Sequence, residues 1–208
     1  MGAVKQAIHG YLACISYADA MMGRVLDALE ASDYADNTII ALFSDHGFHL
    51  GEQGLWTKAN NYELSTRVPL LVVHPAQKTP GQRSKALVEL VDVFPTLVEL
   101  CGLPLPEGLE GTSLVPLMLD PERAWKPAVF SQFPRARTGN RHKGHGDIMG
   151  YAVRSKTHRY VEWREWKSGK VLAQELYDHR EDPREMNNIA HKTGARPDLQ
   201  RLQSLLKK

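Results

Sequence analysis

The strongest constraint on the fold is a long amphipathic stretch that is followed by a short apolar run. Between residues 4 and 30, apolar side chains recur at spacings of three and four, as on a helix with one apolar face. Residues 38–43 then form a short run, apolar after Thr38, of the kind found in strands buried on both faces. A helix followed by such a strand is half of a βαβ unit, and this order predicts an α/β fold.

Further elements of the same kind follow as far as about residue 102. Residues 68–73 predict a second buried strand, and residues 86–90 predict a third. Asp92 stands where it can cap a helix that runs to residue 100, and Gly102 is suited to end that helix. The first part of the chain therefore reads as an α/β arrangement.

The pattern changes in the last third of the chain. Short segments now alternate between apolar and polar residues, which is typical of paired antiparallel strands. These segments are residues 128–133, 149–154 and 160–166, and a helix is expected over residues 197–208. We therefore predict two parts, an α/β part over residues 1–125 and a smaller antiparallel α+β part over residues 126–208.

Composition excludes several classes of protein. A formal net charge of +2 over 208 residues is too small to indicate a nucleic-acid binder. The two cysteines, Cys14 and Cys101, form no CxxC pair and indicate neither a disulfide framework nor a zinc site. No apolar run approaches the roughly 20 residues of a membrane span. The composition is instead that of a globular chain with a sizeable core.

Chemistry-bearing side chains gather directly after the first predicted strand. Asp45 and His46 follow Phe43, in the region beyond a strand end where open α/β sheets bind ligands. A carboxylate suits Ca²⁺ or Mg²⁺, whereas an imidazole suits softer metals. Lys58 offers a positive charge to an anionic group. The alternative is ordinary turn chemistry at Asp45 and His46, with Lys58 as a solvated surface lysine.

A basic segment over residues 134–147 offers a second candidate for anion binding. It contains five basic residues after Arg135, and Asp147 opposes them. Such a segment can hold an anionic glycan, or it can be a solvated loop without a ligand. Of these two, the solvated loop is slightly favoured.

An ordered series of motifs gives the sequence a family resemblance. The motifs are SDHG at 44–47, GLWTK at 54–58, TRVPL at 66–70, VDVFPTL at 91–97 and FSQFPR at 130–135. With them the chain resembles the sulfatases of the alkaline-phosphatase-like superfamily, and most of all the iduronate-2-sulfatase and choline-sulfatase group. The resemblance implies an α/β, alkaline-phosphatase-like sulfatase fold, of which this chain would form the C-terminal part of the main mixed sheet with its helices, plus a small antiparallel α+β C-terminal subdomain.

The resemblance also implies roles for three residues. Asp45 would be a ligand of a calcium ion, and His46 matches the family position beside it. Lys58 would contact the sulfate and neutralise charge on the transferring group, as expected of electrostatic stabilisation of a transition state. The implied cofactor is Ca²⁺, and the implied substrate is a sulfated sugar or another small sulfate ester.

One part of the sulfatase machinery is absent from the sequence. Sulfatases of this kind use a formylglycine nucleophile made within a Cys/Ser-x-Pro/Ala-x-Arg signature, and neither Cys14 nor Cys101 nor Ser131 begins one. The chain thus resembles only the C-terminal portion of a sulfatase. We expect it to lack turnover alone, and to pair with an N-terminal sulfatase chain or with itself.

Two other functions stay open at this point. The chain can be a catalytically inactive fragment that acts as a binding or pairing module. It can also be a phosphodiesterase or phosphonate hydrolase of the same superfamily, although the GLWTK stretch at 54–58 disfavours this possibility.

Overall fold

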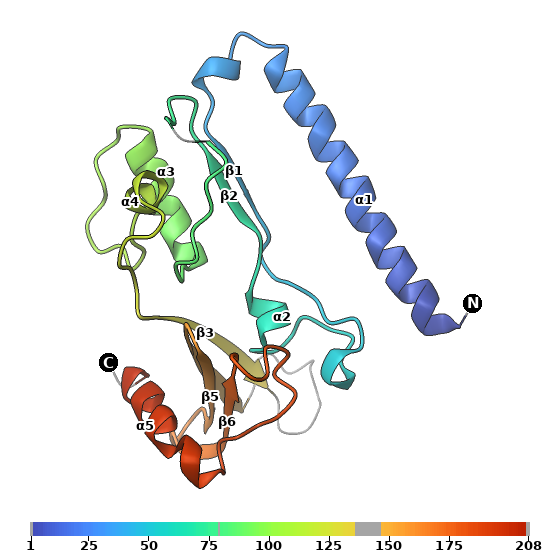
Figure 1. Ribbon diagram of the computed structural model, residues 1–208, viewed down its shortest axis with the longest axis vertical. Coiled ribbons are helices and arrows are strands. Elements are labelled where there is room, and N and C mark those ends of the chain that lie inside the picture. The colour runs from blue at the N-terminus through green and yellow to red at the C-terminus, as the bar shows by residue number, and fades with distance from the viewer. Residues whose placement is uncertain (1, 79, 136–146, 207–208) are drawn as a thin grey trace.

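The computed structural model describes residues 2–78, 80–135 and 147–206 (Figure 1). A long helix, α1 (Ala3–Glu30), runs along one side of the molecule, as its apolar period predicts. Tyr11 of this helix stacks on Phe48, with ring centroids 5.7 Å apart. No residue of α1 is buried, so the apolar face of the helix stays exposed.

The first two strands form a pair on their own. β1 (Ile40–Phe43) and β2 (Leu70–Val73) are antiparallel, with Phe43 opposite Leu70, and they make a two-stranded sheet. An apolar run indicates burial but not strand direction, so the sequence alone did not give the antiparallel pairing of β1 with β2. Phe43 is also 49% exposed, so the strand is not buried on both faces.

The segment between β2 and helix α3 (Val93–Leu100) differs from its prediction. Residues 86–90 do not join a sheet, and a short 3₁₀ helix, Leu90–Asp92, ends this segment. Helix α3 follows as expected with Asp92 at its N-cap position, but the Asp92 side chain makes no capping hydrogen bond to it. The buried Asp92 carboxylate instead accepts hydrogen bonds from the backbone of Glu89 and Thr112 and from Lys126 Nζ. These bonds connect the loop before α3 to Thr112, which precedes the short helix α4 (Val115–Leu119), and to Lys126, which follows it.

The C-terminal part is a four-stranded antiparallel sheet, and the alternating segments predict three of its strands. Its order is β3–β4–β5–β6, so each strand pairs with the next along the chain. The strands are β3 (Ala128–Arg135), β4 (Ile148–Ser155), β5 (His158–Glu165) and β6 (Val171–Asp178), and helix α5 (Arg196–Leu205) covers one face. The division of the chain at residue 125 stays a prediction.

The two faces of this sheet have different partners. Because successive side chains of a strand point to opposite faces, one face buries Val153, Tyr160 and Leu176 against Leu202 of α5. The opposite face carries Arg159, which contacts the short helix α2 (Glu63–Thr66). The sheet is thus covered on one side by its own helix and is bonded on the other to the segment that leads from β1 to β2. No helix among the described residues has the length and apolarity needed to cross a membrane.

Candidate functional site

The site loop, residues 44–62, begins where β1 ends. Ser44 Oγ donates to the carbonyl of His46 at 2.7 Å, which fixes the first turn. Gly47 N–H donates to the carbonyl of Ser65 in α2 at 2.9 Å. A Cβ on Gly47 would lie 2.0 Å from the carbonyl oxygen of Leu64, so only glycine permits this approach. Gly47 is therefore needed for the contact with α2.

His46 and Lys58 are in direct contact across the loop. His46 Nδ1 lies 2.9 Å from the carbonyl oxygen of Gly47, and a carbonyl can only accept a hydrogen bond. His46 Nδ1 therefore carries the proton, which leaves Nε2 as an acceptor. Lys58 Nζ lies 2.5 Å from this Nε2 and donates to it. The contact of His46 Nδ1 with the Gly47 carbonyl thus selects the tautomer whose Nε2 accepts a hydrogen bond from Lys58.

Asp45 completes this group of three side chains. Its Oδ2 lies 3.6 Å from His46 Nε2, and its side chain is 82% exposed. The structure therefore brings together all three residues that the sequence singled out. The group presents a carboxylate, an imidazole nitrogen and an ammonium at one end of β1. The carboxylate and the imidazole suit a cation, and the ammonium suits an anion beside it.

A cation such as Ca²⁺ fits part of this arrangement. Two ligands bound side by side to one Ca²⁺, at about 2.3–2.6 Å each, lie roughly as far apart as Asp45 Oδ2 and His46 Nε2. Two ligands do not satisfy the six to eight positions that Ca²⁺ prefers. In addition, the His46 nitrogen now receives Lys58, which would have to move. Asp45 and His46 can therefore supply one edge of a cation site.

A buried ion cluster lies behind the loop, and the sequence analysis did not single it out. Arg159 Nε donates to Glu185 Oε1 at 2.6 Å, and Arg159 Nη2 donates to Glu63 Oε2 at 2.5 Å. Arg154 Nε adds a third bond, to the same oxygen of Glu63, at 3.0 Å. His179 Nε2 lies 2.7 Å from Glu185 Oε1. The cluster joins α2 to β4, β5 and the loop after β6.

The carboxylates of the cluster are held in their ionised form. Burial alone would raise the pKa of Glu63, but the guanidiniums of Arg159 and Arg154 outweigh it and hold this pKa at about 2. Burial likewise opposes ionisation of Glu185, yet the bonds from His179 and Arg159 lower its pKa. Both groups are therefore charged at neutral pH, and their charges are paired.

Three members of the cluster also have the composition of a metal site. One ligand atom each of Glu63, His179 and Glu185 lies within 4.8 Å of the others. However, Glu63 Oε2 and Glu185 Oε1 already accept from arginine, and Glu185 Oε2 accepts from the backbone N–H of Glu63 at 2.7 Å. With two arginines supplying the positive charge, the carboxylates have no need of a metal ion.

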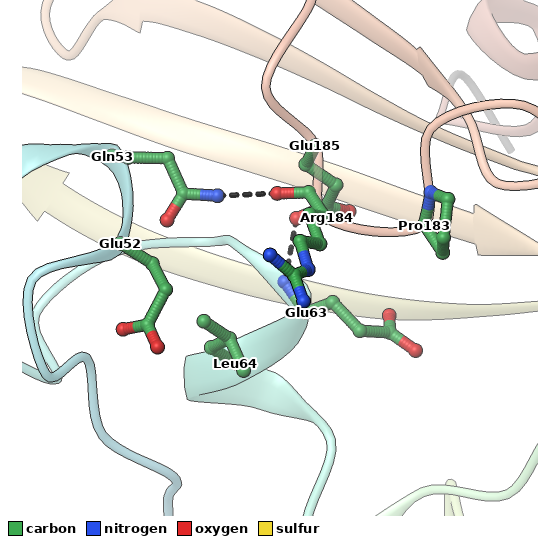
Figure 2. Close-up of a pocket in the computed structure, with 7 residues that line it drawn as sticks. All are labelled: Glu52, Gln53, Glu63, Leu64, Pro183, Arg184 and Glu185. Carbon is green, nitrogen blue, oxygen red and sulfur yellow. Dashed lines mark hydrogen bonds between the residues drawn. The ribbon is translucent and has the colours of Figure 1, made fainter.

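A pocket of about 210 Å³ opens beside this cluster (Figure 2). The amide of Gln53 points across it and donates to the carbonyl of Arg184 at 2.5 Å. The residues that line the pocket are Glu52, Gln53, Glu63, Leu64, Pro183, Arg184 and Glu185. Asp45, His46 and Lys58 do not line it, so the pocket is a separate feature of the loop.

Most of the basic segment at 134–147 lies outside the described residues. Arg135 is described, and its guanidinium stacks over the ring of Trp163 at 4.2 Å from the centroid. This cation–π contact places Arg135 on the sheet. The expected grip of the segment on an anionic glycan stays a prediction.

Comparison with known proteins identifies relatives over the whole chain. Residues 2–103 match the family model described as Sulfatase. A sulfatase of Formosa agariphila is 35% identical over 207 residues, which is 100% of this chain and 37% of that protein. Iduronate 2-sulfatase of Mus musculus is 32% identical over 236 residues, or 86% of this chain and 43% of that protein.

Solved structures share the fold. A protein in complex with its substrate D-glucosamine-2-N,6-O-disulfate aligns with a TM-score of 0.81 and 31% identity, over 95% of this chain and 39% of that chain. Phosphonate monoester hydrolase of Agrobacterium radiobacter aligns with a TM-score of 0.79 and 27% identity, over 92% and 38%. The chain thus spans about two fifths of the length of the proteins it matches.

Proposed function

The chain belongs to the sulfatase family, and from this premise we propose that its site loop is one part of the active site of a sulfuric ester hydrolase. The observation that carries the proposal is the convergence of Asp45, His46 and Lys58 at the end of β1. These are the residues to which the family resemblance gives roles.

Each of the three residues has a distinct part in the proposed reaction. Asp45 and His46 would hold one edge of a Ca²⁺ ion, which when bound polarises the sulfate ester. Lys58 would turn from His46 Nε2 to the sulfate and neutralise the negative charge that is shared among the sulfate oxygens. Lys58 is exposed and His46 is a neutral acceptor, so no buried ion pair has to be broken for this movement.

The site requires a second part that carries the nucleophile. No residue of the 208 begins a Cys/Ser-x-Pro/Ala-x-Arg signature, and the chain spans only about two fifths of its relatives. We propose that the complementary sulfatase portion, on the same polypeptide or on another chain, supplies the nucleophile and the remaining calcium ligands. A pairing module without catalysis is the second candidate, and the exposed apolar face of α1 favours it.

The proposed substrates are sulfated sugars and other small sulfate esters. A structural relative with 31% identity was solved in complex with a disulfated glucosamine, and relatives at similar identity include an iduronate 2-sulfatase. The complementary sulfatase portion would contribute further residues that select among such sulfate esters.

A chimera tests this function directly. Residues 2–206 would replace the matching segment of the Formosa agariphila sulfatase, whose remaining portion would supply the rest of the site. We expect hydrolysis of 4-nitrophenyl sulfate, and we expect Lys58→Ala to lower kcat by roughly 10²–10³-fold, the usual cost of losing one charge-stabilising donor. Asp45→Ala should lower activity and should also raise the calcium concentration needed for half-maximal rate.

The matched control is Lys167→Ala, which removes an exposed lysine from the turn between β5 and β6. It should leave the rate unchanged. An active chimera in which Lys58→Ala and Lys167→Ala behave alike would remove Lys58 from the proposed site. A preference for a phosphonate monoester over the sulfate ester would favour the phosphonate hydrolase instead.

A further inference from the structure

Helix α2 is connected to the site loop near both His46 and Lys58. Near His46, the carbonyl of Ser65 in α2 accepts a hydrogen bond from the N–H of Gly47. Near Lys58, Asn60 N–H donates to the carbonyl of Lys58 at 3.0 Å, and Asn60 Oδ1 accepts a hydrogen bond from the N–H of Tyr62 at 2.9 Å. Tyr62 is the residue that precedes α2, so a shift of this helix would displace His46 and Lys58 relative to each other.

Helix α2 is too short to hold this position unaided. It has four residues, and one helical turn does not repay the cost of fixing its backbone. Its first N–H, on Glu63, is bonded to Glu185 Oε2 at 2.7 Å. Arg159 Nη2 donates to Glu63 Oε2 and also to Thr66 Oγ1, at 3.0 Å, so one guanidinium spans the helix from its first to its last residue.

The C-terminal part supplies this support from rigid elements. Arg159 lies in β5 and is 2% exposed, and Glu185 is also 2% exposed. Glu185 has a φ of 55°, a conformation that costs free energy for a residue other than glycine unless its surroundings impose it. Here the bonds of its carboxylate to Arg159, His179 and the Glu63 N–H impose it.

A second contact from the same sheet reaches the loop beside the cluster. Asn61 Nδ2 donates to the carbonyl of Gly150 in β4 at 3.1 Å, and Ser131 Oγ in β3 lies 3.3 Å from Asn61 Oδ1. A Cβ on Gly150 would lie 2.7 Å from Asn61 Nδ2, so the strand and the loop approach closely. Tyr177 in β6 also lies against Tyr62, with ring centroids 5.9 Å apart, so all four strands of the sheet contact the five residues that follow Lys58.

We propose that Glu63, Arg159 and Glu185 are positioning residues, which hold α2 and through it fix the placement of His46 and Lys58 relative to each other. The hydrogen bond between Lys58 Nζ and His46 Nε2 reports this placement in the chain without a ligand. The three positioning residues touch neither the proposed substrate nor the proposed metal, and act through α2. The catalytic importance of this geometry rests on the proposed function. The geometry itself does not, because it can be measured in the chain without any hydrolysis.

The tautomer of His46 provides a spectroscopic test on the full chain. A solvated imidazole favours a proton on Nε2, whereas a hydrogen bond from Nδ1 to the Gly47 carbonyl requires the proton on Nδ1. The ¹⁵N shifts of the ring would be recorded at a pH where the imidazole is neutral, with His46→Gln to assign the signals. The wild-type chain should show a protonated Nδ1 and an unprotonated Nε2.

Two variants of Glu63 then separate positioning from mere folding. Glu63→Ala removes the acceptor of Arg154 and Arg159 and should shift His46 towards the solvated tautomer. Glu63→Gln keeps an acceptor oxygen and should retain most of the wild-type signature. Leu202→Ala destabilises the same sheet from its other face and should leave His46 unchanged.

Two results would overturn the proposal. One is a wild-type His46 signature in Glu63→Ala. The other is an equal loss of that signature in Leu202→Ala. Should Glu63→Ala fail to give a dispersed spectrum, Arg159→Met perturbs the cluster from the sheet side and is judged by the same two criteria.

Discussion

The two ends of the chain differ in how they bury their apolar side chains. In the C-terminal sheet, Val153, Tyr160, Leu176 and Leu202 are fully buried within a single cluster. In α1, 28 residues long, none is buried. Large apolar side chains of α1 stay exposed, such as Leu12 at 54% and Val25 at 69%. The difference indicates that the C-terminal part provides its own core, whereas the N-terminal part presents surfaces that another segment can cover.

The site loop lies between these two ends and depends on both. Its support comes from the sheet, through Glu63 and Arg159. Its candidate ligands, Asp45 and His46, stand at the end of β1, whose Phe43 is half exposed. The loop is thus held by the sheet on one side, while Asp45 and His46 remain accessible on the other, where the proposed second part of the active site would bind.

The largest expected effect comes from the self-contained core. Leu202→Ala removes a fully buried side chain and should lower the free energy of unfolding by about 2–5 kcal/mol. Leu26→Ala on α1, where the side chain is 45% exposed, should change it by no more than about 0.5 kcal/mol. Urea unfolding of both variants makes the measurement. Similar losses in both would break the contrast between the two ends.

An intermediate effect is expected from acid. The pKa of Glu63 is about 2 in the folded chain against an ordinary value of 4.5, so this group stabilises the fold above pH 4.5. That contribution is lost as the pH falls from 4.5 towards 2, and amounts to roughly 3 kcal/mol at most. In urea unfolding at pH 6 and pH 3, Glu63→Gln should lose less stability than the wild-type chain does. Equal losses would show that Glu63 is not paired as described.

The smallest effect on stability is expected on α1. Leu12→Glu combined with Val25→Glu places charges on side chains that are 54% and 69% exposed. The melting temperature should barely change, because these side chains lose few contacts. Binding of a dye that reports exposed apolar surface, and any self-association measured by light scattering, should decrease. A marked loss of stability would instead mean that α1 packs against its own chain in solution.

The sequence predicts the elements of this fold better than their partners. Apolar periodicity locates α1 and the alternating strands of the C-terminal sheet, because these patterns are local. It does not report the direction of β1 and β2, and it predicts a third strand at 86–90 that has no place in a sheet. Direction and pairing depend on segments that lie far apart along the chain.

The candidate site shows the same limit. Asp45 and His46 follow from their place after a strand, and Lys58 follows from its charge a short way along the chain. The family resemblance gives these three residues their roles, which stay proposals. Glu63, Arg159 and Glu185 form their cluster only through the fold, since 96 positions separate the first two. Arg159 is one of several charged residues in β5, so the local sequence does not distinguish it or identify its partner.

Hydrolysis of 4-nitrophenyl sulfate by the purified 208-residue chain tests most directly whether this chain holds only one part of a sulfatase site. The account predicts that, with Ca²⁺ present, the rate equals that of the Asp45→Ala variant and of the buffer, because the sequence carries no signature for the nucleophile. Turnover that Asp45→Ala abolishes would contradict it, because the chain would then contain a complete active site.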